Sequence, residues 1–470
     1  MSDPLWTARQ AMAATGGMLV GDTDWTCSGV SIDTRTIEPG DLFVALKDVR
    51  DGHEFAAAAM EKGAAACLVS RDNMGLEPAL QVRDVLDALR AMGEAARDRT
   101  DAIRVAVTGS VGKTSVKEAL AAVFRAAGPA HWSVKSYNNH WGVPLTLARM
   151  PRETRRAVFE MGMNHAGEIR DLSSLVRPHV ALITRIAPAH LQHLGSIEAI
   201  ADAKSEIFDG MEPDGVAIYP SDDPLGERIA RHARHSCAAF MLDFGTASDA
   251  AVRIEQFETG LDGSTGVANV LGIRARFRIA ASGDHWAWNA GAIFAAAAGA
   301  GLDARDVADA LAEVEAEPGR GRAIRIALPG GGSFVLLDDA YNANPVSMSA
   351  AIAALGAAAP GEGGRRIAVL GDMLELGPDE ARLHAELAEP LNVANVDAVI
   401  ACGDRMRSLY DALALHQRAG YARDAGEGLD LIKTVIRPGD IVLVKGSNAS
   451  GLHRIAANLA DGSAFGLTEA

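Results

Sequence analysis

Cysteine is scarce in this 470-residue sequence, and the few cysteines are scattered. The four residues, at positions 27, 67, 237 and 402, lie 40 or more residues apart and form no CxxC pair. Closely spaced cysteines mark disulfide frameworks and zinc sites, so this distribution argues against both. It predicts reduced thiols in a cytoplasmic protein.

Positive charge is also in deficit, with 45 Lys and Arg against 61 Asp and Glu and a formal net charge of −16. Nucleic-acid binding draws on a basic surface, so we expect no nucleic-acid partner. A phosphate-bearing ligand would instead be held by local donors and a metal ion. The remaining composition, 48% hydrophobic and 23% charged, is typical of a soluble globular protein.

Long hydrophobic runs are missing as well. The longest strongly apolar stretch, residues 290–302, has 13 residues, mostly Ala and Gly, whereas a membrane span needs about 20. The first residues lack the basic start and apolar run of a secretory signal. We therefore expect no membrane insertion.

The length predicts about three domains at roughly 150 residues each. Composition and pattern change near residue 100 and again at residues 317–321. We expect an α/β protein with a small mixed α/β domain over 1–100, a central P-loop domain with a parallel sheet over 101–317, and a Rossmann-like domain over 318–470.

The expected elements follow from apolar runs and their flanking turns. In the first domain we expect a strand over 41–46 and helices over 54–62 and 79–99. Central strands are expected over 104–108, 157–161, 180–184 and 216–219. In the third domain we expect strands over 334–337, 367–370, 399–402 and 441–445, with helices over 345–359 and 379–392.

The sharpest local feature is a glycine-bearing turn between a strand and a helix. Glycines let backbone N–H groups approach a phosphate, and the helix N-terminus adds partial positive charge. Lys113 would contact the β- and γ-phosphates, and the Thr114 hydroxyl would coordinate Mg²⁺. The candidate nucleotide-binding residues are Thr108, Gly109, Ser110, Val111, Gly112, Lys113, Thr114 and Ser115.

The turn departs from the general GxxxxGK[ST] pattern, because Val107 stands where the first glycine belongs. An ordinary glycine-rich turn is the alternative, although the strand, turn and helix all fall in place for a nucleotide. The turn alone would suit a kinase, a switch GTPase or a ligase. The sequence has no Asn-Lys-x-Asp stretch for reading guanine, which weakens the GTPase hypothesis.

Two further candidates follow neighbouring strands. Glu160 and His190 would lie at the carboxyl edge of a parallel sheet, beside the phosphate-binding turn. A hard cation there prefers oxygen ligands and tolerates an imidazole, so both are candidate Mg²⁺ ligands. The alternatives are a turn-capping carboxylate and a histidine that is merely hydrogen-bonded. Lys204, taken alone, reads as a surface lysine.

Together these stretches resemble the Mur ligase family of cell-wall amide-bond-forming enzymes. The resemblance covers all three expected domains, and the short GxxGKT turn is the family's own form. Its most specific pieces are Glu160-Met161-Gly162-Met163-Asn164-His165 and Asp338-Asp339-Ala340-Tyr341-Asn342-Ala343-Asn344-Pro345. They resemble the member that uses ATP, through an acyl phosphate, to join D-alanyl-D-alanine to UDP-N-acetylmuramoyl-tripeptide in peptidoglycan precursor synthesis.

The resemblance implies roles for single residues. Lys204 would be carbamylated by CO₂, and its new carboxylate would help to position a second Mg²⁺. Asn289 would meet adenine, Arg320 an ATP phosphate and Asp339 the ribose. The implied catalytic residues are Lys113, Glu160, His190, Lys204 and Arg320. The implied metal ligands are Thr114, Glu160, His190 and Lys204. Structural roles for Asn289, Arg320 and the Asp338-Asp339 pair stay open.

The first domain resembles the family's UDP-binding module, with one departure, Asp48, where many relatives carry glycine. An exposed charged loop is the alternative for this region. The implied substrate-binding residues are Ser31, Asp33, Arg35, Lys47, Asp51, His53, Asn138, Asn139, Tyr341 and Asn344. We expect a monomer.

Rival hypotheses remain: a ligase that adds one amino acid, a polyglutamate-type relative, a P-loop phosphotransferase without an amine acceptor, and a non-catalytic nucleotide sensor. The stretch from Asp338 to Pro345 speaks against the first two. The sequence leaves open whether the tripeptide ends in diaminopimelate or lysine.

Overall fold

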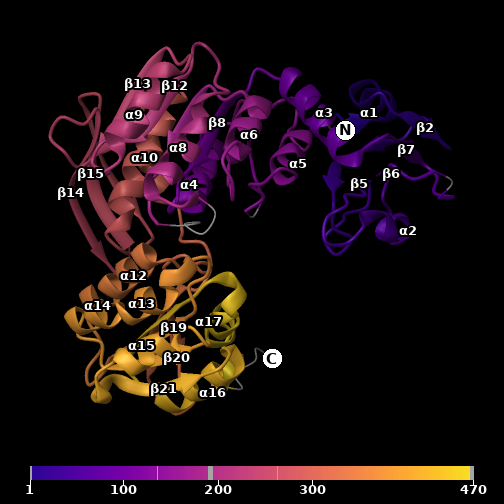
Figure 1. The fold of residues 1–470 in the computed structure, drawn as a ribbon. Helices are drawn as coiled ribbons and strands as arrows, with labels where there is room; N and C mark the ends of the chain where they lie inside the picture. The colour runs from indigo at the N-terminus through magenta and orange to yellow at the C-terminus, as the bar shows by residue number, and fades with distance from the viewer. Residues whose placement is uncertain (1–2, 73, 135, 189–193, 262, 466–470) are drawn as a thin grey trace.

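The computed structural model describes residues 3–72, 74–134, 136–188, 194–261 and 263–465. These residues form three sheets of five, nine and six strands and one two-stranded pair. Figure 1 shows the nine-stranded sheet at the upper left, the N-terminal sheet to its right and the C-terminal sheet below it. The expected α/β class is confirmed. None of the described helices is long and apolar enough to cross a membrane.

The N-terminal sheet has the order β2-β7-β6-β5-β4. Its strands are β2 (Met18–Val20), β4 (Gly29–Ser31), β5 (Asp41–Val44), β6 (Ala66–Val69) and β7 (Ala79–Gln81), and β1 (Trp6–Thr7) pairs with β3 (Thr26–Cys27) outside it. The helices are α1 (Ala8–Thr15), α2 (Ala56–Glu61) and α3 (Val85–Asp98).

The expected helix over 79–99 is wrong in its first turns. Leu80 is completely buried and lies in β7, which pairs with β2 on one side and β6 on the other. The helix begins only at Val85, because the Asp84 carboxylate caps it by accepting from the Asp87 backbone N–H.

The central sheet has the order β16-β15-β14-β13-β12-β11-β8-β10-β9. Its strands are β8 (Ile103–Thr108), β9 (Ala130–Trp132), β10 (Arg156–Glu160), β11 (Val180–Ile183), β12 (Val216–Pro220), β13 (Phe240–Gly245), β14 (Val252–Gly260), β15 (Gly263–Val270) and β16 (Ile273–Ile279). The four expected strands are confirmed and pair in parallel, whereas β14, β15 and β16 form an unforeseen antiparallel extension.

Helices cover both faces of this sheet. One core cluster packs α4 (Lys113–Ala126), α10 (His285–Gly299) and α11 (Ala304–Leu311) against it. A second cluster packs α5 (Gly142–Ala148), α6 (Glu168–Val176), α8 (Ile197–Ser205) and α9 (Gly226–His235) against the other face. The indole N–H of Trp6 donates to the Ala148 carbonyl, which ties the N-terminal part to α5.

The C-terminal sheet has the order β17-β18-β22-β19-β20-β21. Its strands are β17 (Arg322–Ala327), β18 (Ser333–Asp339), β19 (Arg366–Gly371), β20 (Ala398–Cys402), β21 (Arg418–Ala422) and β22 (Ile441–Lys445). Its helices are α12 (Pro345–Ala357), α13 (Glu380–Ala385), α14 (Ala388–Val393), α15 (Arg407–Ala412), α16 (Ala425–Val435) and α17 (Leu452–Ala460). The strands β18, β22, β19, β20 and β21 are parallel, as a Rossmann-like unit requires.

The single helix expected over 379–392 is instead two short helices, α13 and α14. Pro390 lacks the N–H that a continuous helix would need at this position. Restarting the helix at Ala388 places Pro390 in a first turn, where that N–H is dispensable.

Candidate active site

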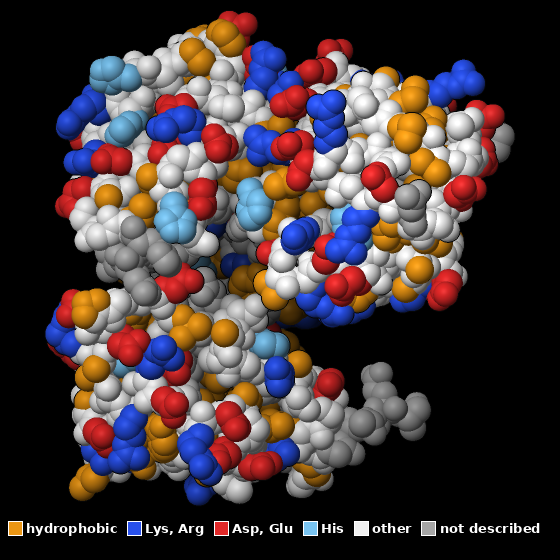
Figure 2. Space-filling model, turned by 45° about the vertical axis from the view of Figure 1, so that its right-hand side comes forward, with side chains coloured by type: hydrophobic (Ala, Val, Ile, Leu, Met, Phe, Trp, Pro, Cys, Tyr) orange, Lys and Arg blue, Asp and Glu red, His pale blue; other side chains and the backbone are white. Residues whose placement is uncertain are grey.

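A cavity of about 640 Å³ lies between the central and C-terminal parts. Its wall includes the turn between β8 and α4, the segment between β9 and α5, the ends of β10 and β11, the end of α8 and the start of α10. The segment before β17 and the end of β18 with the start of α12 complete it on the C-terminal side. Figure 2 shows the surface hollowed where these two parts meet. The volume is that of a pocket for a ligand of nucleotide size.

The turn between β8 and α4 has the conformation that a phosphate cradle needs. Gly109 and Gly112 have positive φ angles of 151° and 86°, which side-chain-bearing residues rarely adopt. A Cβ atom at Gly109 would also lie 2.0 Å from the Thr184 hydroxyl. The Lys113 ammonium donates to the Gly109 carbonyl at 2.7 Å, so it lies folded over the turn. Burial lowers the pKa of Lys113, and the nearby Arg320 lowers it further, against the opposing effect of Glu160.

The turn is braced by neighbouring strands. The Thr108 hydroxyl donates to the Met161 carbonyl at 2.8 Å, and the Thr184 hydroxyl donates to the Val111 carbonyl at 2.6 Å. The Ser110 backbone N–H donates to the Arg185 carbonyl at 2.7 Å. These bonds fix the turn before any ligand arrives, which limits the entropy lost on binding.

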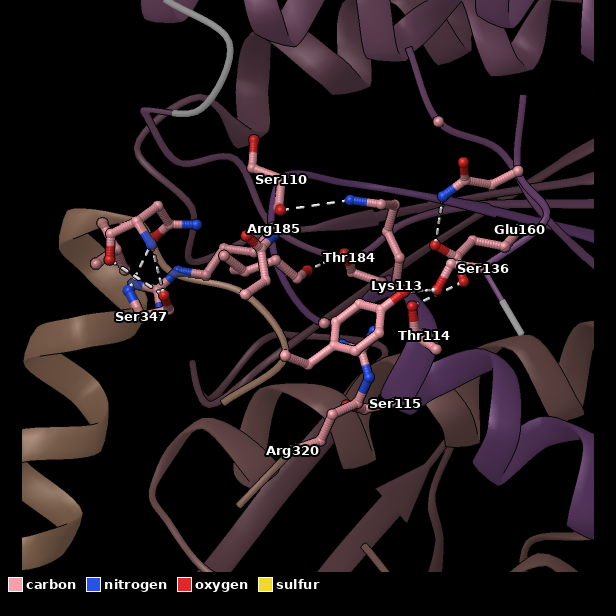
Figure 3. A pocket seen from close by; sticks show the side chains of 18 of the residues that line it. Ser110, Lys113, Thr114, Ser115, Ser136, Glu160, Thr184, Arg185, Arg320 and Ser347 are labelled. Carbon is pink, nitrogen blue, oxygen red and sulfur yellow. Dashed lines mark hydrogen bonds between the residues drawn. The ribbon is translucent and has the colours of Figure 1, made fainter. Parts of the chain in front are cut away.

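Glu160, at the end of β10, is 1% exposed and faces the first turn of α4. One carboxylate oxygen accepts from the Thr114 hydroxyl at 2.8 Å, and the other accepts from the Asn138 amide at 2.8 Å. Figure 3 shows the Thr114 hydroxyl next to the Glu160 carboxylate, which lies beside the Lys113 side chain. The expected meeting of Glu160 with the phosphate-binding turn is therefore seen in the geometry.

Lys204 lies at the end of α8, is 1% exposed and lines the same cavity. It is not the surface lysine that its sequence alone suggests. Burial lowers the pKa of Lys204 well below its ordinary value, and Lys113 lowers it further, while Glu160 opposes both. Within the described ranges, no residue accepts a hydrogen bond from its ammonium.

Two buried polar side chains at the cavity lack a hydrogen-bond partner among the described residues. They are the Ser110 hydroxyl and the Asn289 amide nitrogen. The Asn289 side-chain oxygen lies close to the turn, so that a Cβ atom added at Gly112 would be only 2.6 Å from it. An unpaired buried donor is costly unless a ligand satisfies it. The glycine cradle and these two groups fit a bound nucleotide.

The C-terminal part supplies the opposite wall. The Arg320 guanidinium lies 4.2 Å from the centre of the Tyr341 ring, and Figure 3 shows Arg320 reaching toward the start of α4. Asp338 is a turn device, as the structural alternative foresaw, because its carboxylate accepts from the Gly319 backbone N–H at 2.8 Å. Burial raises the pKa of Asp338.

Two other expected residues of this wall are held by their own neighbours. Asp339 accepts from the buried Lys445 ammonium at 2.7 Å. Asn344 caps α12: its side-chain oxygen accepts from the Ser347 backbone N–H at 2.9 Å. In return, the Ser347 hydroxyl accepts from the Asn344 backbone N–H. Both line the cavity, but each also stabilises its local turn.

The cavity does not unite all the expected residues. The described lining residues include Asn138, Asn139 and Tyr341, but none of them comes from the N-terminal part of the chain, residues 1–100. The expected residues there are Ser31, Asp33, Arg35, Lys47, Asp51 and His53. His190 lies outside the described residues.

The N-terminal candidates form two small networks of their own. Arg35 makes a two-pronged ion pair with Asp33 and stays exposed. His53 is 6% exposed, and its ring nitrogens lie 2.6 Å from Asp51 and 2.9 Å from the Ser70 N–H that donates to it. His53 therefore fastens two loops together, and Asp51 has its pKa lowered mainly by the hydrogen bond from His53.

The sequence interpretation missed several lining residues. Thr184 and Arg185 follow β11, next to β8, so the rule that found Glu160 would have found them too. No local sequence pattern marks Ser136 or Trp288 as lining residues. The centre of the Trp288 ring lies 4.5 Å from the Arg185 guanidinium.

The oxygens of Thr114 and Glu160 are the hard ligands that Mg²⁺ prefers. Among the described residues no three His, Cys, Asp or Glu side chains gather around one point. Magnesium commonly takes one or two protein oxygens and completes its shell with phosphate and water. The pair therefore fits a magnesium ion that arrives with a nucleotide.

The comparisons with known proteins cover almost the whole chain. Three family models match: the Mur ligase family catalytic domain over residues 26–124, the Mur ligase middle domain over 107–297, and the Mur ligase glutamate ligase domain over 321–448.

Curated relatives and solved structures agree with these models. The UDP-N-acetylmuramoyl-tripeptide--D-alanyl-D-alanine ligase of Escherichia coli is 36% identical, with 96% of this chain and 97% of that protein covered. The Bacillus subtilis ligase of that name is 35% identical, with 92% and 93% covered. A crystal structure of MurF from Acinetobacter baumannii superposes with a TM-score of 0.84 at 30% identity, covering 98% and 99%. The chain therefore belongs to the Mur ligase family.

Proposed function

We propose that this chain is an ATP-dependent, ADP-forming ligase that joins D-alanyl-D-alanine to UDP-N-acetylmuramoyl-tripeptide. The observation that carries the proposal is the shared cavity, where the phosphate-binding turn faces Arg320 and Asp339 from the C-terminal part. The likeness to curated ligases of this name, at 36% and 35% identity over nearly the whole chain, supports the choice of substrates.

A carboxylate is a poor electrophile, so amide formation needs activation. In this reaction the tripeptide carboxylate oxygen bonds to the γ-phosphorus of ATP, and the bond to ADP breaks. The amine of the dipeptide then attacks the acyl carbon, the C–N bond forms, the amine loses a proton, and phosphate leaves. The product is the pentapeptide nucleotide.

The chain's own residues would serve this chemistry by position and charge. Lys113 and Arg320 approach the cavity from opposite sides and would neutralise the phosphoryl group in transfer. Ser110 and Asn289 would donate their unpaired hydrogens to the nucleotide, with Asn289 at adenine and Asp339 at the ribose. The walls from two parts of the chain would exclude water, which hydrolyses acyl phosphates.

Mur ligases use ATP with Mg²⁺, and Thr114 and Glu160 would hold the ion in this chain. Bound there, magnesium would supply positive charge to the phosphate oxygens. His190 and Lys204 complete the proposed ligand set.

Lys204 is proposed to carry a CO₂-derived carbamate. In that step the ammonium first releases one proton, and the neutral amine nitrogen then bonds to the CO₂ carbon and loses a second proton. A buried cation thereby becomes an anion. The support is geometric: a fully buried lysine lies in a cavity that also holds Lys113, without a described hydrogen-bond acceptor. Incubation with ¹³C-labelled CO₂ should give a carbamate NMR signal that Lys204→Arg lacks. Absence of the signal in active wild-type enzyme would refute the modification.

The remaining assignments concern the rest of the substrate. We place the UDP portion on the N-terminal part, residues 1–100, and the reaction between residues 101–317 and 318–470. Ser31, Asp33 and Arg35 would meet the diphosphate or the sugar-lactyl region, and Lys47 and the loop from Asp51 to His53 would shape the uridine pocket. Asn138 and Asn139 would contact the tripeptide end, since both line the cavity. We propose a cytoplasmic monomer, which sedimentation of the purified protein would test.

One assay separates the proposal from its rivals: phosphate release with tripeptide nucleotide alone, dipeptide alone, both or neither. The ligase requires release only with both, together with a pentapeptide product by mass spectrometry. Release with one acceptor would indicate a phosphotransferase, and binding of ATP without acceptor-dependent release would indicate a sensor. Lys113→Ala is the inactive control.

A further inference from the structure

One hydrogen bond spans the cavity between two residues 205 positions apart. The Ser136 and Tyr341 hydroxyls lie 2.6 Å from each other. Ser136 belongs to the segment between β9 and α5 of the central part, and Tyr341 follows β18 of the C-terminal part. Both line the cavity, so the bond joins its two walls.

The Tyr341 ring makes a second contact, with the segment that leads into β17. Its face lies 4.2 Å from the Arg320 guanidinium, and its backbone N–H donates to the Gly319 carbonyl at 3.1 Å. Gly319 has a φ of 79°, and a Cβ atom there would lie 3.0 Å from the Tyr341 Cβ. The close approach of ring and segment therefore depends on this glycine.

An aromatic face orients a guanidinium without neutralising it. Within the part of the chain that the structure describes, no carboxylate pairs with Arg320. A carboxylate partner would fix the side chain but would also occupy its donors and cancel its charge. A cation–π contact fixes the side chain and leaves the forked donors free for an anion. Tyr341 thus suits an arginine that must meet phosphate.

We infer that Tyr341 is a positioning residue. Its ring orients the Arg320 guanidinium into the cavity, and the hydrogen bond between its hydroxyl and Ser136 holds the ring in place. The inference rests on the proposed function, because Arg320 is taken to meet the transferring phosphoryl group. Tyr341, expected from the resemblance to bind substrate, thereby acts through Arg320. In the transition state the negative charge is spread over the oxygens of the transferring phosphoryl group, and Arg320 would stabilise that charge. Misplacing Arg320 should therefore lower kcat more than it weakens substrate binding.

The full-length enzyme allows the two contacts to be removed one at a time. Tyr341→Phe keeps the ring and deletes the hydroxyl, and Ser136→Ala deletes its partner. Each should lower kcat by roughly fivefold to tenfold, the usual effect of one hydrogen bond. The double variant should be no slower than the single variants, because both delete the same interaction. The KM for the dipeptide should stay within about twofold of wild type.

Tyr341→Leu removes the ring as well, and kcat should fall at least several-fold below that of Tyr341→Phe. Adding Arg320→Ala to Tyr341→Leu should cost less than Arg320→Ala costs in the wild type. A melting temperature close to that of wild type shows that a variant is folded. If Tyr341→Leu does not fold, Tyr341→Phe and Ser136→Ala still test the inference.

Two outcomes would overturn the inference: unchanged kcat in Tyr341→Phe, or multiplicative losses in the double variant. A change in dipeptide KM alone would assign Tyr341 to substrate binding instead. Failure of the proposed function is a separate result, since wild-type enzyme would then form no pentapeptide.

Discussion

The Thr114 hydroxyl donates a 2.8 Å hydrogen bond to the Glu160 carboxylate, which joins the first turn of α4 to the end of β10. The Asn138 amide holds the second oxygen of that carboxylate. The chain thus presents two adjacent oxygens, fixed in direction, beside the phosphate-binding turn. Two such oxygens suit a magnesium ion, so substitutions here should change how the activity depends on magnesium.

Removing the Thr114 hydroxyl should weaken the response to magnesium. Thr114→Val preserves shape and deletes the oxygen, so the Mg²⁺ concentration for half-maximal rate should rise by about tenfold or more. Thr114→Ser keeps the hydroxyl and should stay within about threefold. Initial rates across a magnesium titration provide the measurement, and equal curves for the Val and Ser variants would contradict the assignment.

A carboxylate supplied from solution should replace the proposed carbamate. Lys204→Ala should lose activity by at least about a hundredfold and regain roughly tenfold with formate or acetate, which can enter the vacated space. Lys204→Arg keeps a cation and fills the space, so it should be inactive with or without the additive. Rates are compared at fixed ionic strength. An active Lys204→Arg enzyme would show that no carbamate is needed.

His131 should make stability depend on pH in a defined window. Burial lowers its pKa from 6.5 to about 4, so the unfolded chain binds the proton more readily than the folded one. Stability from this group is therefore complete above pH 6.5 and lost as the pH falls toward 4, by up to about 3 kcal/mol.

The variant His131→Gln should flatten this loss relative to wild type. The comparison uses thermal melting at pH 7 and pH 5, with His416→Gln, on an exposed site, as the matched control. Parallel pH profiles for wild type and His131→Gln would refute the prediction.

Asn344 should act on stability through its cap. Asn344→Ala loses the bond to the Ser347 N–H and should destabilise the C-terminal part by about 1 kcal/mol. Asn344→Ser retains a capping oxygen and should be close to wild type in melting temperature. If both variants raise the dipeptide KM equally, Asn344 also contacts substrate; if neither does, its role is the cap alone.

The expected fold was recoverable where the chain alternates buried strand and helix. The extension β14 to β16 was not foreseen. Strand β15 has no charged residue and begins with small and polar residues, so no clear pattern marks it. Strand β16 does alternate apolar and charged residues, as in Ile273-Arg274-Ala275-Arg276-Phe277. Ala275 and Phe277 become core residues only through packing against the rest of the central part. The alternation in β16 predicts a half-buried strand, but it does not predict that this strand extends the central sheet.

The site divides in the same way. Thr108 to Ser115 and Glu160 are predictable, because a glycine turn and a strand end carry their own geometry. Lys204 needed the family resemblance, since its burial comes from helices distant in sequence. The contact between Ser136 and Tyr341 depends on how two sheets dock, which no local pattern encodes.

The approach of Asn289 to Gly112 couples two positions that are 177 residues apart in the chain. Any side chain at 112 would displace the amide oxygen and also occupy a disfavoured backbone conformation. A smaller residue at 289 relieves only the first difficulty, so Gly112 has no single compensating substitution elsewhere. Variation in this family member should accordingly accumulate at 289 before it is tolerated at 112.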